Sequence, residues 1–300
     1  MKKAPLERLR TEQANLATAA LDTRSAREIA AIINAEDTRV AVAVARALPE
    51  IARAIDAIAQ ALTSGGRLIY VGAGTSGRIA ALDAAECPPT FNTQPDTVQY
   101  VMSGGDQALG RAAESQEDWP AQGRRDIAKR KPSKRDVVVG ISASGRTPYT
   151  VAALSYARTH GATTVAVTNN RGSWLERVCE IAIVVEVGPE VVAGSTRMKA
   201  GTAQKLVLNM LSTGAMARLG YVYGNLMVNV HVTNKKLLER GVTVLERAAG
   251  VRRDAARRAL AAAGRSVPVA LVMLKARGNK AEARRRLKAA RGNVRQAIES

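Results

Sequence analysis

The sequence is poor in several residue types, and each shortage removes a class of protein. Aromatic residues make up 3% of the 300 residues, so aliphatic side chains must form most of the core, as in parallel sheets covered by helices. Two cysteines, Cys87 and Cys179, are too few for a disulfide scaffold. No His, Cys and Asp residues cluster at the spacing of metal ligands. We therefore expect neither a disulfide-rich domain nor a metal site.

Long apolar runs are also missing. No segment approaches the roughly 18 apolar residues that a membrane helix needs. Residues 1–8 carry positive charges, but no apolar signal core follows them. We therefore expect a soluble, cytoplasmic protein with no membrane partner.

Positive charge, by contrast, is in excess. The net charge is +19, and residues 235–300 hold 18 basic against five acidic residues, a net charge of +13. A basic segment can bind nucleic acid or an acidic membrane surface. This one has no interleaved aromatic residues for base stacking and no zinc-finger spacing. We interpret it as the solvated faces of Arg-rich helices and do not expect a nucleic-acid partner.

The hydrophobic period changes along the chain. Residues 1–64 have helical spacing, with a capping box at Ser25 to Glu28 and an apolar stripe at Ile51, Ile55 and Ile58. Strand-length apolar runs then alternate with helical stretches. The runs cover residues 67–71, 98–102, 136–141, 163–167 and 181–185. This alternation predicts an α/β fold in which a parallel sheet has helices on both faces.

Three parts are predicted from this pattern. Helices at 1–64 pack on a central α/β domain at 65–240. Residues 241–300 form short helices separated by glycines, which we interpret as a small C-terminal helical domain.

Three loops rich in Gly, Ser and Thr stand where a ligand would bind. They cover residues 72–77, 142–147 and 194–197. The first two follow predicted strands, and ligands of parallel sheets sit at the carboxyl ends of strands. Glycine allows close backbone approach, hydroxyls donate hydrogen bonds, and a helix start offers free N–H groups to an anion. The loops therefore predict a phosphate cradle.

Residues 72–77 also match the dinucleotide fingerprint G-x-G-x-x-G. That fingerprint expects an acidic residue at the end of the next strand. Here the next strand ends in Met102 and Ser103, and Asp96 lies before the strand. The Walker A pattern is absent as well, so we expect no nucleotide cofactor.

Few residues are left to do chemistry. His160 precedes Gly161 at a predicted helix end, which is typical of a cap, and His231 lies in an apolar helical stretch, which is typical of packing. Glu86 precedes two prolines, which we expect to end its helix. Glu117 belongs to an acidic cluster at 114–118. Two glutamates in one pocket could divide the roles of acid and base.

Four motifs together are similar to the N-acetylmuramic acid 6-phosphate etherase family. They read GAGTSGR at 72–78, ECPPT at 86–90, SASGRTPY at 142–149 and GSTRMKAGT at 194–202, and the likeness covers nearly the whole chain. The resemblance implies a sugar-isomerase (SIS) domain, a homodimer and a reaction without cofactor. In that reaction, N-acetylmuramic acid 6-phosphate and water give N-acetylglucosamine 6-phosphate and D-lactate.

The resemblance also implies roles for individual residues. Glu86 and Glu117 would be the catalytic pair, with Glu86 as the proton donor. As a separate hypothesis, we expect Arg197 or Lys199 to face the lactyl carboxylate. The predicted substrate-binding residues are Gly74, Thr75, Ser76, Ser142, Ser144, Thr147, Ser195 and Lys199.

Three other readings stay open. An aldose–ketose phosphosugar isomerase would share the phosphate loops but would not need the segment that contains Glu86. A sugar-phosphate sensor that resembles glucokinase regulatory protein would not need the two glutamates, yet both are present. A regulator that binds nucleic acid through the basic tail would bind with strong salt dependence.

Overall fold

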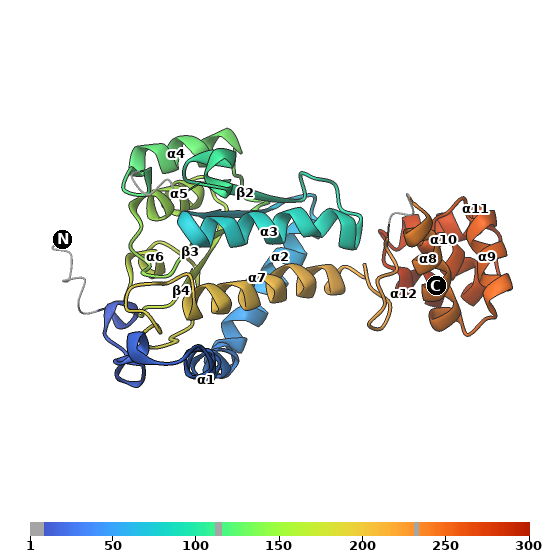
Figure 1. The fold of residues 1–300 in the computed structure, drawn as a ribbon. Coiled ribbons are helices and arrows are strands. Elements are labelled where there is room, and N and C mark those ends of the chain that lie inside the picture. The colour runs from blue at the N-terminus through green and yellow to red at the C-terminus, as the bar shows by residue number, and fades with distance from the viewer. Residues whose placement is uncertain (1–8, 112–115, 231–233) are drawn as a thin grey trace. The chain divides into compact units, whose positions relative to one another are not determined.

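A computed structural model describes residues 9–111, 116–230 and 234–300 (Figure 1). The chain divides into two compact units. Unit 1 contains residues 1–85 and 96–212, and unit 2 contains residues 86–95 and 213–300. The boundaries near residues 64 and 240 stay a prediction from the sequence.

The helices and strands follow one another in this order. The elements up to the third strand are η2 Arg10–Glu12, η3 Leu16–Thr18, η4 Leu21–Thr23, α1 Ala26–Ala45, α2 Leu48–Thr63, β1 Leu68–Gly72, α3 Gly74–Phe91, β2 Val98–Met102, η5 Gly105–Leu109, α4 Pro120–Lys129 and β3 Val137–Ser142. The remaining elements are α5 Pro148–Thr159, β4 Thr163–Thr168, α6 Trp174–Arg177, β5 Ile181–Val184, α7 Lys199–Arg218, α8 Lys235–Ala249, α9 Arg253–Ala262, α10 Val267–Ala276, α11 Lys280–Ala289 and α12 Val294–Glu299.

All five predicted strands are present and form one parallel sheet with the order β2-β1-β3-β4-β5. β1 and β3 are neighbours, paired from Leu68 with Val137 to Gly72 with Ile141. Their carboxyl ends therefore lie side by side, at the edge where ligands of parallel sheets bind. The capping box at Ser25 is also confirmed.

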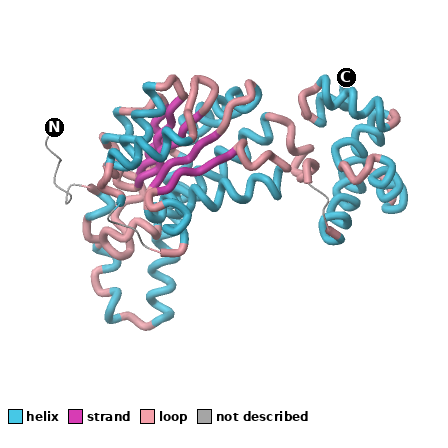
Figure 2. The backbone as a smooth tube through the Cα atoms, turned by 90° about the horizontal axis from the view of Figure 1, so that it is seen from above, coloured by secondary structure: helices cyan, strands magenta, loops and turns pink. Residues whose placement is uncertain are grey.

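Helices cover both faces of the sheet, as predicted, and the strands lie between them (Figure 2). One face packs against α5, which α4 and α6 flank. α2 contacts β1, β3 and β5. On β1, Tyr70 donates a hydrogen bond to Asp83 of α3 (2.8 Å), and Asn209 of α7 donates to the same carboxylate (2.7 Å). This buried cluster holds the two helices together beside the sheet.

The sequence prediction for the two prolines is wrong. Pro88 and Pro89 lie inside α3, which continues to Phe91. Each proline removes one N–H donor from the helix, yet its fixed φ is compatible with helical geometry. The chain leaves the helix only at Asn92, whose φ is +55°. Residues of α3 from Glu86 onward belong to unit 2.

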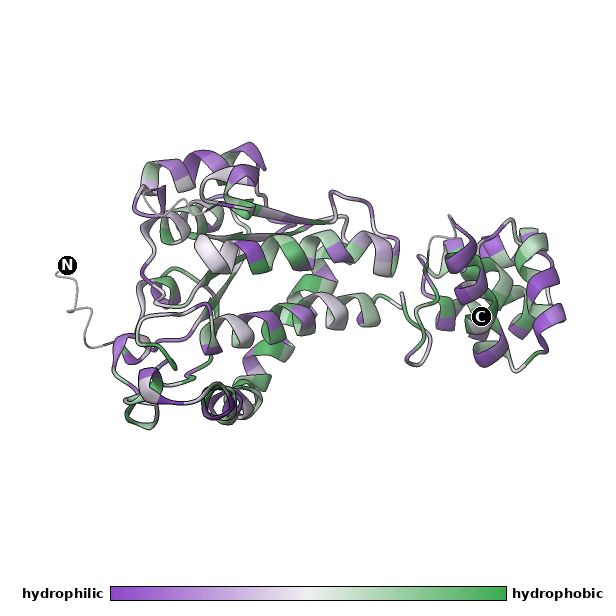
Figure 3. Cartoon of the chain, viewed as in Figure 1, coloured by the Kyte–Doolittle hydropathy of each residue, from purple (hydrophilic) through white to green (hydrophobic). Residues whose placement is uncertain are grey.

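Unit 2 contains the five helices α8 to α12 around a core of Val, Leu and Ala side chains. Side chains of Asn234, Ser266, Asn279 and Asn293 cap four of them. Hydrophilic residues line the outside of these helices (Figure 3). Some of the basic residues pair within the unit, as Arg257 does with Glu239 at 2.9 Å. None of the described helices is long and apolar enough to cross a membrane.

Candidate functional site

The predicted loops meet at one cavity of unit 1, with a volume of about 470 Å³. We call it the loop cavity. It is lined by Glu12, Ala73, Gly74, Thr75, Ser76, Arg78, Glu117, Asp118, Ser142, Ala143, Ser144, Thr147 and Thr196. Six of the eight predicted substrate-binding residues and one of the two predicted catalytic glutamates are among them.

The first wall is the start of α3. The helix begins at Gly74, directly after β1, so the N–H groups of its first turn have no acceptor within the helix. The first N–H with an acceptor among the described residues is that of Gly77, which donates to the carbonyl of Ala73 at 3.1 Å. Thr75 and Ser76 add hydroxyls to the same turn. This arrangement favours binding of an anion at the N-terminus of α3.

The second wall is a cluster of hydroxyls after β3. The Oγ of Ser142 lies 2.9 Å from Oγ1 of Thr147 and 3.4 Å from Oγ of Ser144. Ser142 also accepts the backbone N–H of Gly145 (3.1 Å). Thr147 precedes α5, but its side chain does not cap that helix. The three hydroxyls are thereby held together at the cavity.

Glu117 is fixed between these two walls. Its backbone carbonyl accepts the N–H of Tyr149, in the first turn of α5, at 3.1 Å. Its carboxylate reaches the start of α3, where φ of Gly74 is +53°. A Cβ at Gly74 would lie 2.7 Å from Oε1 of Glu117. The glycine is therefore needed both for the backbone turn and to leave room for the carboxylate.

Two predicted residues do not line the loop cavity, although Thr196, between them, does. Ser195 is one. Lys199 is the other, and its surroundings do not fit the predicted contact with the substrate. Its side chain is 2% exposed, and its Nζ lies 2.5 Å from Oε2 of Glu36, which is 4% exposed. The ammonium is already paired inside the protein, so it cannot face a lactyl group in this arrangement.

This buried pair belongs to a polar cluster at the start of α7. Glu190 accepts the N–H groups of Lys199 and Ala200, both at 2.9 Å, and so caps the helix. Burial raises the pKa of Glu190. Burial alone would also raise the pKa of Glu36, but hydrogen bonds from Lys199 and Asn15 hold it below its ordinary value. The cluster fixes the helix that follows Thr196.

Glu86 is exposed and does not line the loop cavity. It belongs to unit 2, whereas the cavity belongs to unit 1. Its pairing with Glu117 therefore stays a prediction from the sequence.

The other reactive side chains lie elsewhere. His160 follows the last residue of α5, where its ring stacks on Tyr156 and its Nδ1 lies 2.8 Å from the Tyr156 carbonyl, as expected for a cap. His231 lies outside the described residues. Neither Cys87 nor Cys179 forms a disulfide, and burial raises the pKa of the Cys179 thiol to about 11. Within the described ranges, no three His, Cys, Asp or Glu residues could jointly hold a metal ion.

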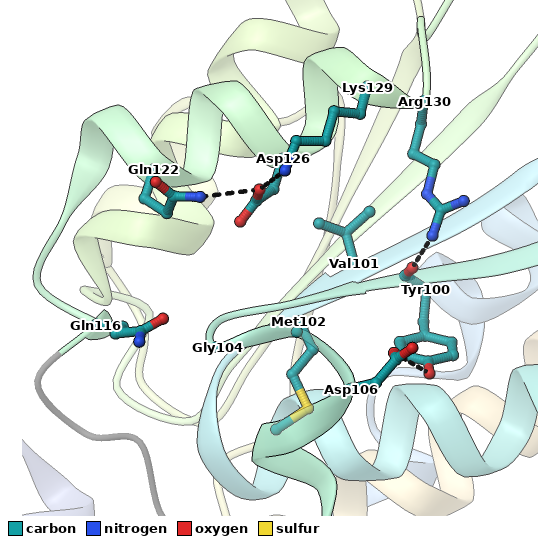
Figure 4. Close-up of a pocket in the computed structure, with 11 residues that line it drawn as sticks. Tyr100, Val101, Met102, Gly104, Asp106, Gln116, Gln122, Asp126, Lys129 and Arg130 are labelled. Atoms are coloured by element: carbon teal, nitrogen blue, oxygen red, sulfur yellow. Dashed lines mark hydrogen bonds and ion pairs between the residues drawn. The ribbon is translucent and has the colours of Figure 1, made fainter.

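A second cavity of about 510 Å³ lies at the edge strand β2 (Figure 4). We call it the edge cavity. Its acidic groups are already bonded within the protein. Asp126 accepts from Lys129 (2.7 Å), Gln122 (3.0 Å) and Tyr149 (3.0 Å). Asp106 accepts the Tyr100 hydroxyl at 2.8 Å. This cavity therefore offers a ligand fewer free polar groups than the loop cavity does.

The predicted site residues leave out six lining residues, namely Glu12, Ala73, Arg78, Asp118, Ala143 and Thr196. All of them except Glu12 lie within or beside a motif that the sequence analysis singled out. Thr196 lies inside the predicted motif at 194–202, but its neighbours Ser195 and Lys199 were predicted as ligands instead. Glu12 has no local signal, because long-range hydrogen bonds of the segment around it bring it to the cavity.

Comparison with known proteins gives consistent results. Residues 129–214 match the SIS domain family, and residues 50–158 match the glucokinase regulatory protein N-terminal SIS domain. The chain is 57% identical to N-acetylmuramic acid 6-phosphate etherase of Symbiobacterium thermophilum over 90% of this chain and 89% of the relative. It is 49% identical to N-acetylmuramic acid 6-phosphate etherase 2 of Vibrio parahaemolyticus over 99% of both chains.

Solved structures support the fold. A phosphoheptose isomerase from Francisella tularensis matches with a TM-score of 0.52 at 18% identity, over 65% of this chain and all (100%) of that chain. At that identity, the likeness concerns the architecture alone.

Proposed function

The chain belongs to the N-acetylmuramic acid 6-phosphate etherase family, and from this we propose that its loop cavity holds the phosphosugar while Glu86 and Glu117 carry out the chemistry. The protein is a carbon–oxygen lyase with a SIS fold. It converts N-acetylmuramic acid 6-phosphate and water to N-acetylglucosamine 6-phosphate and D-lactate, a step in the recycling of peptidoglycan amino sugars.

One observation carries the proposal for the site: Glu117 shares the loop cavity with the start of α3 and with the hydroxyl cluster after β3. The helix start and the hydroxyls of Thr75, Ser76, Ser142, Ser144 and Thr147 suit the phosphate and the polar groups of the sugar. A carboxylate in the same cavity lies within reach of a bound sugar, where proton transfer requires a base.

The reaction proceeds by elimination and addition. In the open-chain sugar, the C1 aldehyde makes the C2 proton acidic, and Glu117 takes that proton. The C2–H electrons form a C2=C3 double bond, the C3–O bond breaks, and lactate leaves with the ether oxygen and a proton from Glu86. Water then adds its OH to C3 and a proton to C2. The aldehyde is the electron sink, so these steps use only side chains and water.

The setting of the enzyme is part of the proposal. We expect it to act as a cytoplasmic homodimer, as its family resemblance implies, without a nucleic-acid or membrane partner. Sedimentation equilibrium at two protein concentrations tests the dimer, and a mass of about 31.8 kDa at both would exclude it.

D-lactate release from N-acetylmuramic acid 6-phosphate tests the proposed function. Wild type should release D-lactate with EDTA present, and Glu86→Gln and Glu117→Gln should each lose at least about 100-fold in kcat. Asp22→Asn, at an exposed carboxylate, is the matched control and should stay active. A folded wild type that binds the phosphosugar but releases no lactate would instead support a sensor.

A further inference from the structure

A segment before the first long helix is tied across unit 1 by hydrogen bonds. We call residues 9–18 the strap. At its centre, Thr11 is fully buried, and its Oγ1 accepts Nδ2 of Asn170 at 3.0 Å. The Thr11 carbonyl accepts the N–H of Gly194 at 3.1 Å, and Oδ1 of Asn170 accepts the N–H of Arg10 at 2.9 Å. Loops more than 150 residues away in sequence therefore fix the strap at Arg10 and Thr11.

The later part of the strap is fixed as well. Asn15 donates through Nδ2 to Glu36 at 2.9 Å, and Thr18 donates through Oγ1 to the carbonyl of Val191 at 2.8 Å. The Asn15 bond joins the strap to the buried carboxylate that also holds Lys199. Residues 12–14 lie between the two anchored parts, and the N–H of Glu12 donates to the carbonyl of Leu9 at 3.0 Å, so the backbone of Glu12 has little freedom to move.

Glu12 faces the loop cavity from this anchored position. It is half-buried, and its Oε2 lies close to Gly194, where a Cβ would approach it to 3.0 Å. Gly194 has a φ of +78°, so glycine meets both the turn and the space that the carboxylate occupies. Across the described part of the chain, the Glu12 carboxylate has no hydrogen bond or ion pair.

A half-buried carboxylate without a protein partner is costly to keep. The strap holds one in place, beside the hydroxyls and the helix start that suit an anion. An ionised carboxylate can only accept hydrogen bonds, and it repels phosphate and carboxylate groups. A sugar offers such an acceptor its hydroxyl groups.

We propose that Glu12 binds substrate in the loop cavity by accepting hydrogen bonds from sugar hydroxyls, and that its charge keeps the anionic groups of the substrate away from the strap. The inference rests on the proposed function for the identity of the sugar. It assigns Glu12 a role in orientation and specificity, separate from proton transfer by Glu86 and Glu117.

Two variants of Glu12 and a control variant of the next residue test this role. Glu12→Ala removes the acceptor, Glu12→Gln keeps its shape and one acceptor oxygen without the charge, and Gln13→Ala changes the exposed next residue. For Glu12→Ala we expect kcat/KM for D-lactate release to fall about 10- to 100-fold, as for loss of a charged hydrogen bond. Glu12→Gln should lose less, and Gln13→Ala should match wild type. Tm should not fall, because the carboxylate has no partner to lose.

Binding measurements separate this role from general damage to the site. Calorimetry with N-acetylglucosamine 6-phosphate and with inorganic phosphate compares wild type and Glu12→Gln, whose size is conserved in case Glu12→Ala folds poorly. The sugar phosphate should bind more weakly to the variant, whereas inorganic phosphate should bind as well or better, since repulsion is removed. Equal affinity of the sugar phosphate for both proteins would overturn the inference.

The same data distinguish the two claims. Weaker sugar-phosphate binding by the variants, with no lactate release by wild type, would leave the Glu12 inference standing and remove the proposed function. Normal lactate release by wild type and by both Glu12 variants would do the reverse.

Discussion

The loop cavity and the edge cavity lie in the same unit and have similar volumes, about 470 and 510 Å³, but their polar groups are used differently. In the edge cavity, Asp126 accepts three side-chain donors of the protein. In the loop cavity, Glu12 is left without a partner among the described residues, and the start of α3 has free N–H groups. The comparison teaches that unsatisfied polar groups, rather than size, mark the site that awaits a ligand.

Exchanging one carboxylate in each cavity should give the largest contrast. Glu117→Gln should lower kcat by about 100- to 10,000-fold, the usual contribution of a general acid or base. Asp126→Asn should keep kcat within a few-fold but lose about 1.5–3 kcal/mol of unfolding free energy, because a charge with three donors is removed. Kinetics and urea unfolding of both variants check the pair.

A matched pair of glycines should give the next largest effect. Gly74 and Gly105 both have positive φ, +53° and +61°. A Cβ at Gly74 meets Glu117, whereas a Cβ at Gly105, in the edge cavity, meets nothing within 4 Å. Both alanine variants should lose about 1 kcal/mol through backbone strain.

Only Gly74→Ala should also reduce kcat, by about 10- to 100-fold through displacement of the carboxylate. Equal activity of the two glycine variants would show that Glu117 does not need its observed position.

Lys199 lines neither cavity, so its substitution should change stability without changing substrate binding. Lys199→Met removes the buried cation beside Glu36 and leaves that carboxylate with Asn15 and the more exposed Arg39, so it should cost about 3 kcal/mol of unfolding free energy. Below its Tm, the variant should keep KM within about two-fold, because the ammonium does not reach the loop cavity. The double variant with Glu36→Gln should recover much of the stability. A large rise in KM at normal stability would restore the original prediction of a substrate contact.

The smallest effect is a pH dependence of stability. The folded-state pKa of Glu36 lies below the ordinary value of 4.5, so its ion pair stabilises the fold above that pH. This stabilisation is lost as the pH falls from 4.5 through the lower folded pKa. Glu36→Gln should therefore lose less unfolding free energy than wild type between pH 6 and pH 3. Parallel curves for the two proteins would contradict the assignment.

The sequence predicted the features that local patterns determine. The five apolar runs became the strands, and the Gly, Ser and Thr loops lie at the carboxyl ends of β1 and β3, because the βαβ order brings those ends together. Pro88 and Pro89 were misjudged, since proline disfavours a helix without always ending it.

The residues that the sequence missed or misplaced depend on distant partners. Lys199 was predicted to contact the substrate, but its ammonium is buried beside Glu36 of α1. Glu12 reaches the loop cavity through bonds of the strap to Asn170 and Gly194, which no local spacing reveals. Such contacts between segments that are far apart in sequence can be found only from the fold.

The central claim is that the enzyme eliminates lactate from the sugar in the loop cavity and then adds water to the unsaturated sugar. Its most direct test is product analysis by mass spectrometry after reaction of wild type and Glu117→Gln in ¹⁸O-labelled water. The account predicts one ¹⁸O in N-acetylglucosamine 6-phosphate, none in D-lactate, and nearly no product from the variant. When the water is also deuterated, it predicts one deuterium at C2, which elimination and addition introduce and direct displacement does not. Label in the lactate, or undiminished product from Glu117→Gln, would contradict it.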